Sequence, residues 1–361
     1  MINVTKTYLP DRSKLDRYID RIYKSGWITN NGELVQELER RLEDYLSVEN
    51  LVLISNGTLA LQIAYRALGI EGEVITTPFS FVATTSSLQW EGLTPVFCDI
   101  NRATYNIDES LIGEKCTSKT TAILPVHVFG NGCEVEKIGE VASRHNLKVI
   151  YDAAHAFGVM YKGRSLLSYG DASILSFHAT KIFHTIEGGA IVFRQKEHAD
   201  RARLMINFGI SGYDKIDTLG INAKMNEFQA AMGLCVLDDM ADIIESRKHI
   251  WERYFSAFKP VTGITLQEHN PGCSYNYTYF PVLFSTDSEM LKCRDTLKES
   301  DIFPRRYFYP SLNTLSYLAG HSQCATSESV SSRILCLPIY QGLDKGVQEK
   351  IIAIVTENAG R

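Results

Sequence analysis

The chain lacks the features that would assign it to several common protein classes. Its 37 lysines and arginines against 42 aspartates and glutamates give a net charge of −5, so there is no basic excess for binding nucleic acid. The longest uncharged stretches, such as Val74 to Trp90, are rich in Thr and Ser and are not membrane spans. The start, MINVTKTYLPDRSK, has no apolar signal segment. We therefore expect a cytoplasmic protein with no nucleic-acid or membrane partner.

Two recognisable ligand motifs are also missing. The eight cysteines are scattered, with no C-x-x-C pair and no histidine at zinc spacing, so reduced thiols are the simplest interpretation and no metal is expected. A nicotinamide-linked sugar oxidoreductase needs G-x-G-x-x-G after its first strand, whereas SNGTLAL (residues 55–61) offers one glycine. That class of enzyme is therefore disfavoured.

What the sequence does contain is the pattern of an α/β protein. With 361 residues it exceeds one typical domain, and its content of hydrophobic residues, 45%, is that of an ordinary globular protein. Short apolar segments alternate with helical stretches, which predicts a parallel sheet covered on both faces. The expected strands are Leu51 to Ile54, Glu73 to Thr77, Thr94 to Asp99, Thr121 to Val126, Leu147 to Asp152, Ser173 to Phe177 and Gly189 to Phe193.

The last third of the chain has the pattern of a smaller α/β domain. Its expected elements are strand-like segments at Ser274 to Leu283 and Ile334 to Ile339, and helices near Ser288 to Lys298 and Lys345 to Thr356. The residues from Asn222 to Ile250 would form a long helical connection. We therefore predict a large domain over residues 1–250, with helices at its N-terminus, and a small C-terminal domain over residues 251–361.

Lys181 is the first candidate for a functional residue. It lies between two expected strands in DASILSFHATKIFHTIEGGAIVF (residues 171–193), so its loop is supported by the sheet at both ends. A solvated surface lysine is the simple alternative. Many polar side chains accompany it, more than a passive loop needs: Ser176, His178, Thr180, His184 and Glu187.

Two further features fall at the ends of expected strands. After Leu51 to Ile54 a glycine turn leads directly into a helix, whose free N–H groups make an anion site; the alternative is a simple N-cap by Asn56 or Thr58. Asp152 ends another strand, where its carboxylate either caps the next turn or awaits a cationic ligand. Ligands of parallel sheets bind beyond the carboxyl ends of the strands.

An anion-binding turn, an acid and a lysine at one sheet edge fit pyridoxal 5′-phosphate (PLP). The phosphate needs helix N–H donors and hydroxyls, the ring nitrogen needs a carboxylate, and the aldehyde needs a lysine for a Schiff base. The turn at Gly57 and Thr58, together with Asp152 and Lys181, offers these groups.

The chain resembles the nucleotide-sugar aminotransferases of the DegT/DnrJ/EryC1/StrS family. The resemblance rests on SNGTLAL, PFSFVATT, YDAAHAFG, SFHATKIFHTIEGGAIVF and GINAKMNEFQAAMG, in the family order, and extends to about Tyr340. It implies the fold type I aminotransferase architecture: a large domain with a mostly parallel seven-stranded sheet flanked by helices, and a smaller C-terminal α/β domain. It also implies a homodimer whose active sites lie at the subunit interface.

The resemblance implies roles for individual residues. Lys181 would bind the cofactor covalently and later move protons, and Asp152 would hold the pyridinium nitrogen. The other implied cofactor contacts are Gly57, Thr58, Leu59 and Ser176 at the phosphate, Phe81 against the ring, His155 beside the ring oxygen where many members have glutamine, and Asn222 reaching the phosphate from the partner subunit. Lys224 stands where arginine is usual, and the two are not interchangeable.

The resemblance also implies the reaction. Members that dehydrate C-3 of a keto sugar have histidine in place of the lysine, so Lys181 favours amino transfer. L-glutamate would leave its amine on the cofactor, as pyridoxamine phosphate, and depart as 2-oxoglutarate, and a nucleotide-linked keto sugar would receive the amine. TYLP, WITNNG and NAKMNEF resemble most the subgroup that converts dTDP-4-keto-6-deoxy-D-glucose to dTDP-4-amino-4,6-dideoxy-D-glucose, a sugar for O-antigen lipopolysaccharide.

Two alternatives stay open. One is amination at C-3 of a dTDP-3-keto-6-deoxyhexose, and the other, of a different class, is a non-catalytic regulator that binds a sugar nucleotide or the cofactor. Candidate substrate contacts are His178 and His184 beside Lys181, and Arg305 and Tyr309 in the segment DIFPRRYFYP (residues 301–310). Each has a structural alternative: local hydrogen bonding for the histidines, a solvated face for Arg305 and the core for Tyr309.

Overall fold

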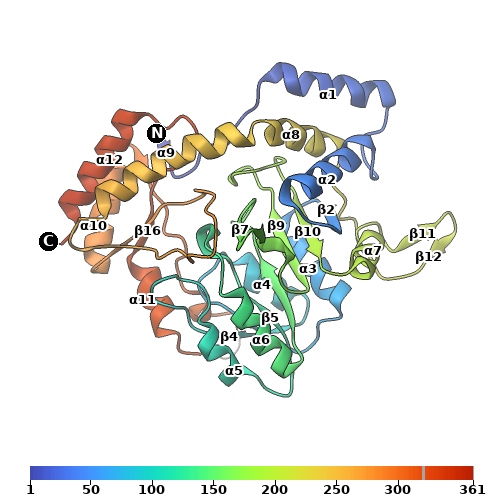
Figure 1. The fold of residues 1–361 in the computed structure, drawn as a ribbon, viewed down its shortest axis with the longest axis horizontal. Helices are drawn as coiled ribbons and strands as arrows, with labels where there is room; N and C mark the ends of the chain where they lie inside the picture. Colours follow the sequence, from blue (N-terminus) through green and yellow to red (C-terminus); the bar gives the residue numbers. More distant parts are fainter. Residues whose placement is uncertain (319–321, 361) are drawn as a thin grey trace.

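A seven-stranded sheet forms the centre of the computed structural model, which describes residues 1–318 and 322–360 (Figure 1). The strands lie in the order β2-β10-β9-β6-β5-β3-β4, and all neighbours are parallel except that β10 is antiparallel to β2 and β9. Their bounds are β2 Leu51–Ile54, β3 Glu73–Thr76, β4 Thr94–Phe97, β5 Thr120–Leu124, β6 Lys148–Asp152, β9 Ala172–Ser176 and β10 Gly189–Phe193. The predicted α/β class and mostly parallel sheet are confirmed, with small shifts at the strand ends.

Helices cover both faces of this sheet. Successive residues of a strand point to opposite faces, so each apolar strand sends side chains into both buried layers. Leu51 and Leu53 join one buried cluster, and Val52 and Ile54 join the other. The first cluster includes residues of α2 (Glu33–Leu46), α6 (Val135–His145) and α8 (Glu227–Asp238). The second includes residues of α3 (Gly57–Leu68), α4 (Ala83–Trp90) and α7 (Lys196–Met205). The sheet is therefore buried on both sides, as its near-continuous apolar strands predict.

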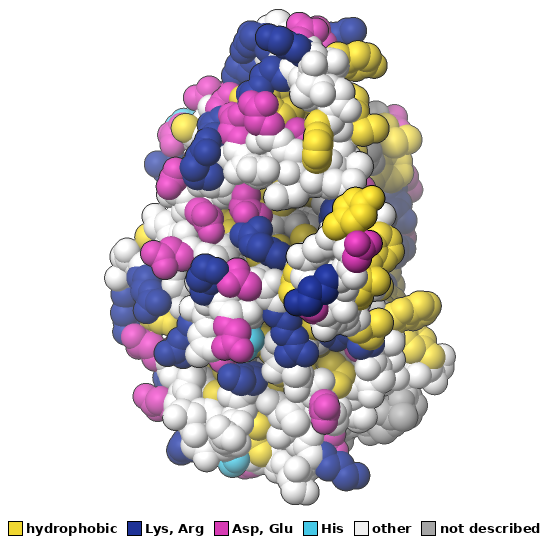
Figure 2. Space-filling view, turned by 90° about the vertical axis from the view of Figure 1, so that its right-hand side faces the viewer, with side chains coloured by type: hydrophobic (Ala, Val, Ile, Leu, Met, Phe, Trp, Pro, Cys, Tyr) yellow, Lys and Arg dark blue, Asp and Glu magenta, His cyan; other side chains and the backbone are white. Residues whose placement is uncertain are grey.

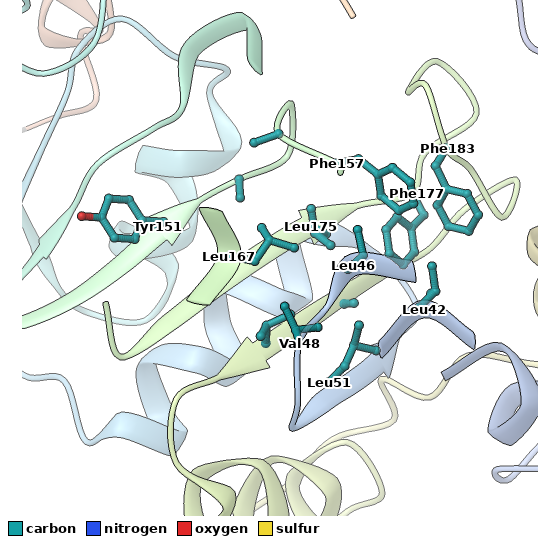
Figure 3. Packing of buried hydrophobic residues seen from close by; sticks show 14 of the residues in the cluster. Leu42, Leu46, Val48, Leu51, Tyr151, Phe157, Leu167, Leu175, Phe177 and Phe183 are labelled. Atoms are coloured by element: carbon teal, nitrogen blue, oxygen red, sulfur yellow. The ribbon is translucent and has the colours of Figure 1, made fainter. Parts of the chain in front are cut away.

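Aromatic packing fixes the loop between β9 and β10. Phe177, at its start, and Phe183, near its middle, are fully buried, and Phe183 stacks on Phe157 with ring centroids 4.6 Å apart. Figure 3 shows Phe157, Phe177 and Phe183 gathered beside the leucines of α2. Backbone hydrogen bonds from Phe177 N to Gly188 O and from Thr185 N to Phe177 O close the base of the loop. The loop that carries Lys181 is therefore anchored in the core.

A second set of elements surrounds a separate buried cluster in the last third of the chain. It comprises the antiparallel sheet β13-β14-β16 and the helices packed on it. Their bounds are α9 Met240–Phe258, β13 Ile264–Leu266, β14 Pro281–Phe284, α10 Asp287–Glu299, α11 Ala325–Arg333, β16 Ile334–Cys336 and α12 Lys345–Asn358. The expected boundary at residues 250 and 251 lies inside α9, and the division into two domains stays a prediction.

Some expected elements differ from the structure. The strand expected at Ser274 to Leu283 forms only at β14, since Tyr277 has φ 55°, a left-handed conformation that no strand accommodates. The strand expected at Ile334 to Ile339 ends at Cys336, close to Pro338. The connection expected from Asn222 to Ile250 is two helices, α8 and α9, that meet at Asp239.

The remaining elements lie outside the two main sheets. β1 pairs in parallel with β15, although the two are almost a chain length apart, and β11 and β12 form a protruding hairpin (Figure 1). Their bounds are β1 Ile2–Asn3, α1 Arg12–Ser25, α5 Ile112–Lys115, β7 Met160–Tyr161, β8 Arg164–Ser165, β11 Ile210–Gly212, β12 Lys215–Ile216 and β15 Ile302–Phe303. Among the described helices, none combines the length and apolar character needed to cross a membrane.

The hairpin and its flanks expose many apolar side chains. Tyr213 at the tip is fully exposed, and the others are at least two-fifths exposed: Phe208, Ile210, Ile216, Leu219 and Ile221. Figure 2 looks onto this side of the molecule and shows hydrophobic side chains gathered along one edge. Exposed apolar residues that lie together can serve as an interaction surface.

Candidate active site

A cavity of about 370 Å³ lies where β2, β6 and β9 end, at the carboxyl edge of the sheet. This is the position expected for a ligand site in a parallel sheet. The cavity brings together many of the residues predicted from the sequence, namely Gly57, Thr58, Phe81, Asp152, His155, Ser176, His178, Lys181 and Arg305. The remaining predicted residues, Leu59, His184, Asn222 and Tyr309, are not among those that line it.

The amine of Lys181 lies inside this cavity on the anchored loop. The Lys181 N–H donates to His178 O at 2.8 Å, which holds the backbone at this point. Desolvation by burial lowers the pKa of Lys181 to about 8, against the opposing effect of the negative charge of Asp152. An amine with this pKa is partly neutral near physiological pH, so it is available as a nucleophile and as a proton acceptor.

Asp152 is the last residue of β6, and its carboxylate is 6% exposed. Burial raises its pKa, while two hydrogen bonds and the charge of Lys181 lower it. Thr84 Oγ1 donates to Oδ2 at 2.8 Å, and the N–H of Ala154 donates to Oδ1 at 3.2 Å. A buried carboxylate held by neutral donors gains from a cationic ligand, so it suits a protonated ring nitrogen.

The turn between β2 and α3 is shaped to receive a phosphate. Asn56 Oδ1 accepts from the N–H of Leu59 at 2.9 Å, so this N–H is capped, and the implied contact of Leu59 with the cofactor stays a prediction. Within the described chain, no hydrogen bond engages the N–H groups of Gly57 and Thr58 at the start of α3. A side chain on Gly57 would begin 3.0 Å from the Cβ of Ser176, so glycine keeps this space open. Helix N–H groups, a positive dipole end and two hydroxyls converge there.

His155 is buried in a neutral form among aromatic rings. Burial lowers its pKa well below the usual value, and its ring lies parallel to that of Phe308, at a 5° interplanar angle. The N–H of Phe129 donates to His155 Nδ1 at 3.3 Å, which assigns the proton to Nε2. The Nε2–H group is therefore the donor that this histidine offers a ligand in the cavity.

Three more lining residues face the open part of the cavity. Phe81 is 57% exposed, so one ring face is available for stacking. His178 Nδ1 lies 2.8 Å from Thr180 Oγ1, and its Nε2 lies 3.6 Å from a carboxylate oxygen of Glu187. The guanidinium of Arg305 lies 5.7 Å from the centroid of the Tyr307 ring. A cation and a histidine at the mouth of the cavity suit an anionic substrate.

His184 and Tyr309 have structural contacts instead. His184 accepts the N–H of Ile186 at Nδ1, so its Nε2 donates to Tyr8 O, at 2.7 Å, and ties the loop to the N-terminal segment. Tyr309 is 55% exposed, and the guanidinium of Arg306 lies 3.6 Å from its ring centroid. These contacts favour the structural alternative for His184 and a surface position for Tyr309.

Asn222 and Lys224 lie at the base of the hairpin, apart from the cavity of their own chain. Lys224 Nζ donates to Asn222 Oδ1 at 2.9 Å and lies 5.0 Å from the centroid of Phe208. Contact between Asn222 and a phosphate therefore requires a second subunit, and this role stays a prediction.

The structure adds lining residues that the sequence did not single out. Ser80 and Thr84 flank Phe81 in the sequence and lie at helical spacing, a signal that was available in the sequence. Three aromatic lining residues come from far along the chain and carried no local signal: Tyr279, Tyr307 and Phe308.

Comparison with known proteins gives consistent matches over almost the whole chain. A model of the DegT/DnrJ/EryC1/StrS aminotransferase family matches residues 11–356. The dTDP-4-amino-4,6-dideoxy-D-glucose transaminase of Shigella dysenteriae is 42% identical, covering 99% of this chain and 98% of the relative. The enzyme of the same name from Escherichia coli is 40% identical, covering 98% of each.

Two further matches bear on the substrate and the fold. The dTDP-3-amino-3,6-dideoxy-alpha-D-galactopyranose transaminase of Aneurinibacillus thermoaerophilus is 34% identical, covering 95% of each chain. The crystal structure of DesI in the presence of its TDP-sugar product superposes with a TM-score of 0.94 at 32% identity, covering 100% of this chain and 93% of that one.

Proposed function

The chain belongs to the DegT/DnrJ/EryC1/StrS aminotransferase family, and on this premise we propose that it aminates C-4 of dTDP-4-keto-6-deoxy-D-glucose with L-glutamate as donor. It is a PLP-dependent sugar aminotransferase. The products are dTDP-4-amino-4,6-dideoxy-D-glucose and 2-oxoglutarate. The observation that carries this choice of sugar is the identity of 42% and 40%, over nearly the full length, to two enzymes with that name.

The residues of the cavity suit PLP at each of its polar groups. The N–H groups of Gly57 and Thr58, with the hydroxyls of Thr58 and Ser176, are placed for the phosphate. Asp152 would hold the ring nitrogen, and His155 Nε2–H would donate to the ring oxygen. Bound PLP supplies an electron sink for the reacting carbon and carries the amino group between the two substrates.

Lys181 performs the proton transfers in this proposal. Its lowered pKa provides a neutral Nζ, which takes the proton from the α-carbon of glutamate. Nζ would pass this proton to the bound cofactor, and in the second half of the reaction it would take a proton back from the cofactor and deliver it to C-4 of the sugar. As a carboxylate, Asp152 would hold the positive ring nitrogen in place, supported by Thr84 and the Ala154 N–H.

Arg305 and His178 bind the anionic parts of the substrates. Glutamate carries carboxylates and the sugar nucleotide carries a diphosphate, and both enter the same cavity in turn. Arg305 lies at the cavity mouth, where a guanidinium can bind either group in a bidentate manner. His178, held by Thr180 and Glu187, offers a second polar contact beside Lys181.

We propose a homodimer in which each subunit completes the site of the other. The exposed apolar residues of the hairpin provide a surface for association, and Asn222 and Lys224 lie at its base. In this arrangement the partner subunit's hairpin brings Asn222 to the phosphate. The product would enter O-antigen synthesis, and the enzyme would act in the cytoplasm.

The test is to treat the purified holoenzyme with L-glutamate, remove the donor and add a keto sugar. The visible absorbance of the bound cofactor changes with glutamate and returns when the correct sugar is added. If the original absorbance returns with dTDP-4-keto-6-deoxy-D-glucose, and NMR shows an amine at C-4 of the product, the proposal is supported. Return only with the 3-keto isomer would establish C-3 amination instead. Absorbance that never responds to glutamate would favour the non-catalytic regulator.

A further inference from the structure

We infer that Thr84 is a positioning residue that holds Asp152 ionised and oriented, at the end of a hydrogen-bond chain from Ser80 through Thr84 to Asp152. This inference rests on the proposed function, because Asp152 acts on the ring nitrogen only if the cavity binds PLP.

The three side chains form one continuous buried chain. Thr84 Oγ1 lies 2.8 Å from Asp152 Oδ2 and 2.7 Å from Ser80 Oγ. Their exposed fractions are 0% for Thr84, 3% for Ser80 and 6% for Asp152. An ionised carboxylate accepts only, so the single hydroxyl proton of Thr84 points to Asp152 and Ser80 donates to Thr84. The direction of the chain is therefore fixed while Asp152 is charged.

Few other groups stabilise this carboxylate. Within the described residues no ion pair engages Asp152, and its other hydrogen bond, from the Ala154 N–H, is longer at 3.2 Å. The titratable groups that face it are Lys181 on the loop and Tyr65 of α3, and burial raises the pKa of Tyr65 so that it stays neutral. Thr84 is therefore the side chain that acts most directly on the charge of Asp152, and a hydrogen bond to a charged group is a strong one.

The backbone around Thr84 also carries Phe81, the aromatic residue proposed to contact the ring of the cofactor. The N–H of Thr84 donates to Phe81 O at 3.1 Å, so the residue that clamps Asp152 and the aromatic residue at the cavity mouth share one backbone segment. Movement of this segment would displace Thr84 and Phe81 together. The position of Thr84 at the start of α4 therefore fixes two contacts of the cofactor.

The residue after Thr84 in the sequence provides a matched control. Thr85 is also fully buried, and its Oγ1 has no hydrogen-bond partner among the described residues. T84V and T85V remove the same hydroxyl from neighbouring positions and keep the shape of the side chain. T84S keeps the hydroxyl at position 84 and serves as the rescue variant. Comparison of the three separates the hydrogen bond to Asp152 from packing.

The first measurement is the rate of the glutamate half-reaction in the holoenzyme, followed by absorbance. Loss of a hydrogen bond to a charged group predicts a rate about tenfold to a hundredfold lower in T84V, and little change in T85V or T84S. Equal rates in T84V and T85V would overturn the inference, and so would a T84S variant as slow as T84V.

The second measurement uses the cofactor-free protein and is independent of activity. Removal of the Thr84 donor raises the pKa of Asp152 further, so the folded state is penalised once Asp152 is ionised. T84V should therefore lose more thermal stability relative to wild type at pH 7.5 than at pH 4.5, and T85V should not. A deficit that is the same at both pH values would overturn the inference. Failure of amino transfer in the wild-type enzyme would instead count against the proposed function, since this pH comparison needs no turnover.

Discussion

Phe177 and Phe183 pack edge to face, with ring centroids 4.8 Å apart and an interplanar angle of 89°. They are the two ends of a short segment with Lys181 between them, and both rings are buried. The position of the reactive amine therefore depends on the hydrophobic core as well as on the polar groups around it.

Phe183→Ala should lower the unfolding free energy of the protein and also weaken the packing that holds the Lys181 loop. Removal of a buried phenylalanine costs about 3–5 kcal/mol of unfolding free energy, which urea denaturation measures. Tyr23→Ala removes an aromatic ring that is 78% exposed and serves as the control, with a change below about 0.5 kcal/mol. Equal losses in the two variants would show that Phe183 does not anchor the loop.

Lys181→Ala should abolish turnover while the protein remains folded. Loss of both the nucleophile and the proton carrier predicts a decrease of about a thousandfold or more in kcat. Lys196→Ala is a suitable control, because Lys196 pairs with Asp200 on an exposed helix face. The product is quantified by chromatography, and transamination that persists in Lys181→Ala would refute the assigned role.

The lowered pKa of Lys181 also has a consequence for stability. The unfolded amine stays protonated up to pH about 10.4, whereas the folded amine loses its proton near pH 8, so below pH 8 the fold carries the cost of a buried charge. In the cofactor-free protein, Lys181→Met should therefore raise the unfolding free energy at pH 7 by about 1–3 kcal/mol. The gain should shrink as the pH approaches 10. Urea titrations at pH 7 and 9.5 test this, and an equal gain at both would contradict it.

Gly57→Ala should weaken cofactor binding, because the new Cβ would lie 3.0 Å from the Cβ of Ser176. A displacement of the turn removes part of the phosphate contacts, and we expect the Kd for PLP to rise about tenfold, the effect of one weakened charged hydrogen bond. Gly139→Ala in α6 is the matched control, because a methyl group added there would meet no described atom within 4 Å. That variant should keep its Kd and gain about 0.5–1 kcal/mol in stability.

Arg305→Gln should reduce the affinity for dTDP, because we propose that the guanidinium of this cavity-lining residue binds the diphosphate. We expect a Kd about tenfold higher by calorimetry. Arg306→Gln is the neighbouring control, because Arg306 contacts Ser332 O and the Tyr309 ring and does not line the cavity. An unchanged Kd in Arg305→Gln would move the diphosphate site elsewhere.

The sequence was sufficient to predict the sheet and the residues at its edge. Strand spacing located Lys181, Asp152 and the turn at Gly57, because the carboxyl ends of parallel strands meet at one edge. It was not sufficient for loop side chains, whose direction is set by distant contacts. The bond between His184 and Tyr8 joins residues 176 positions apart, and no local pattern encodes it.

The sequence also could not predict the aromatic lining residues that come from the last third of the chain. Tyr279, Tyr307 and Phe308 come from the last third of the chain and are brought to the site by tertiary packing, in which Tyr279 and Phe308 share a buried cluster with Phe79 and Phe129. The strand predicted at Ser274 to Leu283 was also too long, because Tyr277 has a left-handed backbone conformation. Thr84 was predictable in principle from its helical spacing to Phe81.

The pairing of β1 with β15 links the first residues of the chain to Ile302 and Phe303, next to Arg305. During synthesis the ribosome makes β1 first and its partner only some 300 residues later, so the strand waits unpaired while most of the protein emerges. The β1–β15 pair beside Arg305 can therefore form only late in translation. The central sheet, whose strands all precede residue 194, can assemble well before that moment.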